Sequence, residues 1–285
     1  PAAVPSNTAP SPRWAWSVAV VAALAIVAAL WPPLHALHYL AKPAATLLVA
    51  LLVWRAVDAQ PAYRRAVLAG LLLSTLGDIW LMLPRDLFVA GLVSFLLAHL
   101  AYLYAFTRLA ALAPLRWPFA AYALLAAGVV LLLWSHLPAP LRAPVLVYVA
   151  ALATMAAQAA VVAVQRITAS RIAAAIGGLS FVVSDALLAI DRFHTPLPYA
   201  ALWVLASYWL AQFLIGRSVW QSRGGGRNGP LSVLGEQIRA GGVRPATPPG
   251  RTSLQLPHCR GPAPVRICWR CDRDGPARSG VSRSA

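Results

Sequence analysis

The chain has 285 residues, of which 60% are hydrophobic and only 11% are charged, and its mean hydropathy is +0.67. This composition excludes an ordinary soluble globular domain. The formal net charge is +16, but the basic residues divide between short loops and a C-terminal segment, where they would face anionic lipid. The charge therefore indicates a membrane as partner, and we expect no nucleic-acid partner.

Apolar stretches long enough to cross a bilayer follow one another from Trp14 to Trp220. A helix of about 20 apolar residues crosses a hydrocarbon core of about 30 Å and satisfies its own backbone hydrogen bonds. Short separators that contain prolines and charges divide the stretches. The sequence predicts an all-α fold, a polytopic transmembrane helical bundle of about eight spans. The predicted spans are residues 14–31, 36–54, 66–83, 87–107, 117–134, 142–164, 170–190 and 198–219.

Arginines of the predicted loops fall mostly on one side of the membrane. That side has Arg13, Arg55, Arg64, Arg65, Arg108, Arg116, Arg166, Arg171 and Arg217. The other side has only Arg85, Arg142 and Arg192. Because basic loops stay in the cytoplasm, we expect a multi-pass protein of a bacterial cytoplasmic membrane with both termini cytoplasmic.

Three regions follow from the composition. Residues 1–13 form an N-terminal tail, residues 14–222 form the eight-helix transmembrane domain, in which we expect the catalytic site, and residues 223–285 form a basic tail rich in Gly, Pro and Arg. The tail has no hydrophobic periodicity, so we expect disorder there; a divergent or frame-shifted end of the gene is an alternative explanation. A zinc site is conceivable in the tail, although its spacing is not that of a standard finger. Its ligands would be His258, Cys259, Cys268 and Cys271.

Few ionisable residues lie inside the predicted spans, and each is a candidate for function because a charge in a bilayer is costly. Lys42 lies early in the second span, Asp78 near the end of the third and Asp185 near the end of the seventh. The predicted orientation brings these three to the non-cytoplasmic half of the membrane. His99 lies midway along the fourth span. The remaining aspartates, Asp58, Asp86 and Asp191, are expected in loops.

Helical spacing predicts polar or aromatic stripes that face a shared interior. Gly178, Phe181 and Asp185 share one face of the seventh span. Similar stripes are formed by Gly91, Phe95, His99 and Tyr102, by Tyr148, Met155 and Gln158, and by Tyr208 and Gln212. Hydrogen bonds between helices are one explanation for the tyrosines, the glutamines and His99, and contact with a substrate is the other. For the two aspartates we favour function, because a lone carboxylate near hydrocarbon stabilises a structure poorly.

Several strings, in the right order and spacing, resemble the YhhN-type membrane family of lysoplasmalogenases. They are KPAATLL, GDIWLMLP followed by FVAGLVSFLLAHLAYLYAF, and GGLSFVVSDALLAIDRF followed by SYWLAQFLI. The resemblance covers nearly all of residues 36–219 and does not extend to the tail. It implies hydrolysis of the vinyl ether bond of a lysoplasmalogen, a lysophospholipid, to a fatty aldehyde and a glycerophospho-alcohol. It implies no cofactor.

The candidate residues suit this chemistry. Protonation of the β-carbon of a vinyl ether gives an oxocarbenium ion, water then adds, and the hemiacetal collapses. Two carboxyl groups at the edge of a low dielectric can supply the acid and the nearby negative charge. We therefore expect Asp78 and Asp185 to be catalytic, without assigning which is the acid. Lys42 would bind the substrate phosphate, and the other substrate-binding candidates are His99, Tyr102, Tyr148, Tyr208 and Gln212.

Two other classes of protein stay open at this stage. A lipid-binding or transport protein would also place charges inside helices, but it would more often show repeats or broken helices, and neither is evident. A membrane hydrolase for another lipid would usually need a metal. Since the histidines are spread over several spans and loops, we expect no metal ion.

Overall fold

The computed structural model describes residues 12–56, 59–85 and 87–220, and within them every regular element is helical. The all-α prediction is confirmed. The helices are α1 (Pro12–Leu30), α2 (His35–Trp54), α3 (Pro61–Met82), α4 (Phe88–Thr107), α5 (Trp117–Leu133), α6 (Ala139–Gln165), α7 (Ala169–Phe193) and α8 (Ala200–Ser218), with a short 3-10 turn, η1 (Pro32–Leu34). The predictions about Asp58, Asp86, the zinc ligands and the tail at 223–285 concern residues outside the described ranges.

Seven of the described helices are long and apolar enough to cross a membrane, and the chain is a multi-pass membrane protein. The eighth, α5, is apolar but has 17 residues. At about 1.5 Å per residue it reaches about 25 Å, slightly less than the hydrocarbon core. Trp117 begins it and Trp134 follows it, and tryptophan prefers the two interfaces of a bilayer.

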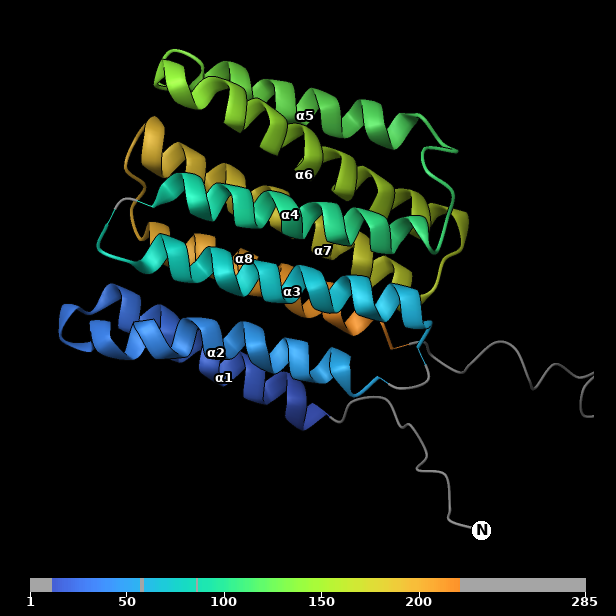
Figure 1. Ribbon diagram of the computed structural model, residues 1–285, viewed down its shortest axis with the longest axis horizontal. Helices are drawn as coiled ribbons and strands as arrows, with labels where there is room; N and C mark the ends of the chain where they lie inside the picture. The colour runs from blue at the N-terminus through green and yellow to red at the C-terminus, as the bar shows by residue number, and fades with distance from the viewer. Residues whose placement is uncertain (1–11, 57–58, 86, 221–285) are drawn as a thin grey trace, which may run out of the picture. The chain divides into compact units, whose positions relative to one another are not determined.

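The helices run up and down in chain order (Figure 1). In one row α2, α3 and α4 pack in sequence, and in the other α1, α8 and α7 do so. Helix α6 packs on both α4 and α7, and α5 lies outermost against α6 and α7. We call the end of the bundle with the turns at 31–34, 83–87, 134–138 and 194–199 the distal end; it lies at the left of Figure 1.

Glycines allow the helices to approach closely at two places that matter for the site. A Cβ on Gly70 of α3 would meet the Tyr102 ring of α4 at 2.2 Å. A Cβ on Gly178 of α7 would lie 3.2 Å from the Ala156 backbone of α6. The small residue predicted on the face of Asp185 therefore holds α7 tightly against α6.

The interior between the two rows is filled by aromatic rings around Phe181 of α7. Its ring centroid lies 4.8 Å from that of His99 and 5.6 Å from that of Tyr208. All the residues of the four predicted stripes except Asp185 are buried, and Asp185 is half-buried. The predicted stripes therefore face the shared interior of the bundle.

One prediction about the distal end is wrong. Asp191 was expected in a loop, but α7 continues to Phe193 and includes it. The helix persists because no proline follows until Pro196, and because Asp191 accepts a hydrogen bond from the Leu197 amide at 2.8 Å, which ties α7 to the next turn. The last turn of α7 thus continues the face that carries Asp185.

Candidate active site

Asp78 lies at the centre of a buried polar cluster contributed by three helices. The Lys42 ammonium of α2 is 3.3 Å from its Oδ1 atom, and both side chains are buried. The Tyr208 hydroxyl of α8 donates to Oδ2 at 2.7 Å, and the Thr46 hydroxyl donates to the same atom at 3.4 Å. A buried charge requires this kind of compensation. The cluster joins α2, α3 and α8 through a single carboxylate.

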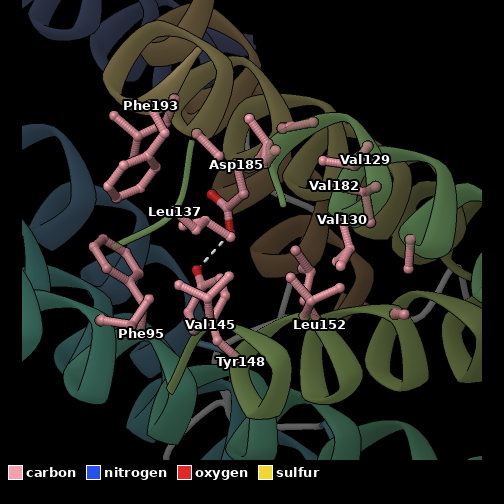
Figure 2. Close-up of a pocket in the computed structure, with 18 of the residues that line it drawn as sticks. Phe95, Val129, Val130, Leu137, Val145, Tyr148, Leu152, Val182, Asp185 and Phe193 are labelled. Carbon is pink, nitrogen blue, oxygen red and sulfur yellow. Dashed lines mark hydrogen bonds between the residues drawn. The ribbon is translucent and has the colours of Figure 1, made fainter. Parts of the chain in front are cut away.

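Asp185 has a different environment. The Tyr148 hydroxyl of α6 donates a hydrogen bond to Oδ2, and Figure 2 shows the two side chains pointing toward one another. Nε2 of His99 lies 4.0 Å from the same oxygen. The side chain of Asp185 is 15% exposed, whereas that of Asp78 is 3% exposed. Asp185 is thus the more accessible of the two carboxyl groups.

A polar cavity brings the two carboxyl groups together. Its walls include Asp78, Asp185, Lys42, Tyr148 and Tyr208, which are five of the eight residues that the sequence proposed for the site. Towards the distal end the cavity is lined by His38, Asp191 and Arg192. The predicted grouping of Lys42 and the two aspartates in one half of the bundle is therefore present in the structure.

A second, apolar cavity extends from the same place between α4, α5, α6 and α7. Valine, leucine and phenylalanine side chains line it, with Phe95 and Phe193 on one side in Figure 2 and Val129 and Val182 on the other. The two cavities share six wall residues, and among these only two are polar: Leu81, Phe88, Phe95, Tyr148, Asp185 and Leu188. Asp185 with its tyrosine stands where the polar and apolar spaces meet.

His99 lies behind this junction. It is fully buried, and its ring packs edge-on against Tyr148 at 5.2 Å and against Phe181 at 4.8 Å between centroids. Neither ring nitrogen has a hydrogen-bond partner among the described residues. The ring lines neither cavity, although it lies next to Tyr148 and Asp185.

Two further candidates are placed away from the cavities. The Tyr102 hydroxyl donates to Oε1 of Gln212 at 2.6 Å, and both side chains are completely buried. This bond joins α4 to α8 and has the form expected of a hydrogen bond between membrane helices. Gln158 acts similarly, since its amide donates to the Ala110 and Ala111 carbonyl groups after α4.

Four residues of the site were not predicted from the sequence: Thr46, His38, Asp191 and Arg192. Thr46 could have been predicted, because it follows Lys42 by four residues and therefore lies on the same face of the helix. Arg192 follows Asp185 by seven residues and so lies on the same face of α7. The assignment of residues 191–197 to a loop concealed that relation. Among the described residues, no three His, Cys, Asp or Glu side chains gather closely enough to hold a metal ion.

The fold and the site together define a multi-pass membrane protein in which a pair of carboxyl groups faces a cavity that is apolar on one side and polar on the other. The chain belongs to the YhhN family, which it matches over residues 37–219.

Relatives of known name agree with this assignment. The chain is 40% identical to the lysoplasmalogenase TMEM86B of Sus scrofa over 172 residues, which are 59% of this chain and 69% of the relative. It is 31% identical to the TMEM86B of Homo sapiens over 73% of this chain and 87% of the relative. It is 35% identical to the lysoplasmalogenase of Mycobacterium tuberculosis over 67% of this chain and 76% of the relative. No solved structure matches the chain.

Proposed function

We propose that this protein is a lysoplasmalogenase, which hydrolyses the vinyl ether bond of an alkenyl-glycerophosphoethanolamine or -choline. The observation that carries the proposal is the position of Asp185 at the junction of the two cavities. A lysoplasmalogen has an apolar chain and a polar head group, and its vinyl ether lies where they join. The apolar cavity would take the chain, the polar cavity the glycerol and phosphate, and the reacting bond would lie against Asp185.

The two environments suggest separate roles for the carboxyl groups. Asp78 faces an ammonium group at 3.3 Å, and Coulomb attraction at that distance stabilises the carboxylate. Asp185 has no lysine or arginine partner among the described contacts, and it borders the apolar space, which favours the neutral acid. We assign Asp185 as the acid and Asp78 as the base.

The two carboxyl groups give and take back every proton that the reaction moves. Asp185 gives its proton to the β-carbon of the vinyl ether, which leaves an oxocarbenium ion that both carboxylates stabilise. Water adds to the cationic carbon as Asp78 takes one of its protons. When the hemiacetal collapses, Asp78 returns that proton to the departing glycerol oxygen, and the hemiacetal hydroxyl gives its proton to Asp185. The products are a fatty aldehyde and the glycerophospho-alcohol, and both aspartates return to their starting states.

Lys42 would act in this scheme through Asp78. Its predicted role was to bind the substrate phosphate, whereas its ammonium group lies against the carboxylate. We propose that it holds Asp78 ionised and in position. Tyr148, Tyr208 and His99 would orient the two carboxyl groups, and the Tyr102–Gln212 pair would serve the packing of α4 on α8.

A substrate panel tests the proposed function. Purified protein in detergent would be given 1-alkenyl-glycerophosphoethanolamine, its saturated 1-alkyl ether and its 1-acyl ester, with the aldehyde and the water-soluble product measured together. The proposal predicts equal amounts of aldehyde and glycerophosphoethanolamine from the alkenyl lipid and no cleavage of the two analogues. Cleavage of the ester at a comparable rate would identify a lysophospholipase instead.

The orientation of the protein in the membrane and the extent of its catalytic domain are part of the same proposal. The proximal end, opposite the distal one, carries most of the loop arginines, which supports cytoplasmic termini in a bacterial membrane. The active site would then open on the non-cytoplasmic side. The family match ends at residue 219, so we propose that residues 14–222 suffice for catalysis. A reporter fused after Trp220 that works only on the outer side would contradict the orientation, and an inactive chain truncated after residue 222 would contradict the extent.

A further inference from the structure

The last turn of α7 carries a cation that the scheme above does not use. Arg192 lines the polar cavity at its distal end, beyond Asp78 and Asp185. Its guanidinium carbon lies 4.3 Å from the centroid of the Phe88 ring and 5.7 Å from that of Phe193. The two rings stack edge to face with centroids 5.5 Å apart. This aromatic platform holds the guanidinium group against the wall of the cavity, which Phe88 also lines.

Helix geometry relates Arg192 to the reacting group. It follows Asp185 by seven residues, so both side chains lie on one face of α7, two turns or about 10.5 Å apart along the axis. In a 1-alkenyl glycerophospholipid, seven bonds separate the β-carbon of the vinyl ether, which receives the proton from Asp185, from the phosphorus. At about 3.8 Å for each three-bond step, this is roughly 9 Å when extended. A substrate whose vinyl ether lies against Asp185 would bring its phosphate within reach of the Arg192 side chain.

The other cations near the cavity fit this task less well. Lys42 is buried deep in the bundle beside Asp78, whereas the Arg192 side chain is exposed and lines the cavity. The imidazole of His38 has its two ring nitrogens on different sides of the ring and cannot bind two oxygens of one phosphate. An arginine is always charged and can hold two oxygens of one phosphate at once. We infer that Arg192 forms the phosphate subsite of this active site; the inference rests on the proposed function and adds the residue that recognises the head group.

The test compares two substrates that differ only in the phosphate. One is 1-alkenyl-glycerophosphoethanolamine and the other is 1-alkenylglycerol, which has the same vinyl ether and no phosphate. Arg192→Gln should raise KM for the phospholipid about tenfold, as expected for the loss of a charge-assisted hydrogen bond. It should leave kcat for that lipid and both constants for 1-alkenylglycerol close to wild type. Arg192→Lys should recover part of the affinity for the phospholipid.

Arg142 provides a matched control. It also lies at the distal end and stacks on an aromatic ring, 5.0 Å from the centroid of Trp134, but it lines neither cavity. Arg142→Gln should change KM for neither substrate. An equal loss on both substrates in Arg192→Gln would show a structural role and overturn the inference, as would an unchanged KM for the phospholipid. If the wild-type protein releases aldehyde from neither substrate, the proposed function itself fails and this inference fails with it.

Discussion

The ammonium group of Lys42 lies 3.3 Å from Oδ1 of Asp78, and the two residues come from different helices, α2 and α3. Removal of one partner from a buried ion pair leaves the other charge uncompensated, which costs about 3–5 kcal/mol. Lys42→Met should therefore lower both kcat and the melting temperature in detergent. The substitution should also change the dependence of kcat on pH, because in the proposed mechanism the ammonium group keeps Asp78 ionised.

A double substitution separates the ion pair from other effects of Lys42. In Lys42→Met/Asp78→Asn no buried charge is left unpaired, so the melting temperature should recover most of what Lys42→Met loses, while activity stays absent. If the double variant loses as much melting temperature as the two single variants lose together, Lys42 and Asp78 are not energetically coupled. Unchanged stability and kinetics in Lys42→Met would show that the ion pair contributes neither to folding nor to turnover.

The two carboxyl groups should act as one unit. Asp78→Asn and Asp185→Asn keep the shape of the side chain and remove the acid or the base, so each should reduce kcat to background while the protein still inserts and elutes as a single species. The double variant should be no worse than either single one, since residues of one catalytic unit are not additive. Substantial turnover in one of the single variants would remove that carboxyl group from the mechanism.

The tyrosines should divide into two groups. Tyr148→Phe removes the hydroxyl that donates to Asp185, and kcat should fall about tenfold or more, as for one lost hydrogen bond to a reacting group. Tyr102→Phe is the matched control, because its hydroxyl donates to Gln212 away from both cavities. It should lower stability by about 1 kcal/mol and leave kcat unchanged. The reverse pattern of kcat values would place the substrate near Tyr102.

The apolar cavity should set the preferred chain length. Ala126 of α5 lines it, so Ala126→Phe should reduce kcat/KM for alkenyl chains of natural length much more than for short ones. A Cβ added to Gly128, two residues further on, would have no neighbouring atom within 4 Å. Gly128→Phe should therefore leave the dependence on chain length unchanged. Equal effects of both variants on all chain lengths would mean that the chain lies elsewhere.

Much of the fold could be predicted from the sequence, because a bilayer requires long apolar helices and charges are rare within them. Asp78, Asp185 and Lys42 stood out for the same reason. Helix ends were harder to place. Helix α3 begins at Pro61 rather than at the predicted residue 66, because proline fits the first turn of a helix. The loop predicted after residue 190 similarly hid the position of Arg192.

The pairing of side chains across helices could not be predicted. Helical spacing shows which residues share a face, but not which helices adjoin. The contact of α2 and α8 with Asp78 depends on the closure of the bundle by α8, far along the chain. For this reason Lys42 was assigned to the phosphate, and Tyr102 and Gln212 were grouped with Tyr148, although they bond to one another.

Hydrolysis in ¹⁸O-labelled water tests most directly the claim that protonation of the vinyl ether is followed by addition of water to the cationic carbon. Wild-type protein would act on 1-alkenyl-glycerophosphoethanolamine in this solvent, with the aldehyde reduced at once to the alcohol so that its oxygen no longer exchanges. The account predicts ¹⁸O in the fatty product and none in the glycerophosphoethanolamine. Label in the glycerol hydroxyl would mean that the bond on the other side of the ether oxygen breaks, and would contradict the mechanism.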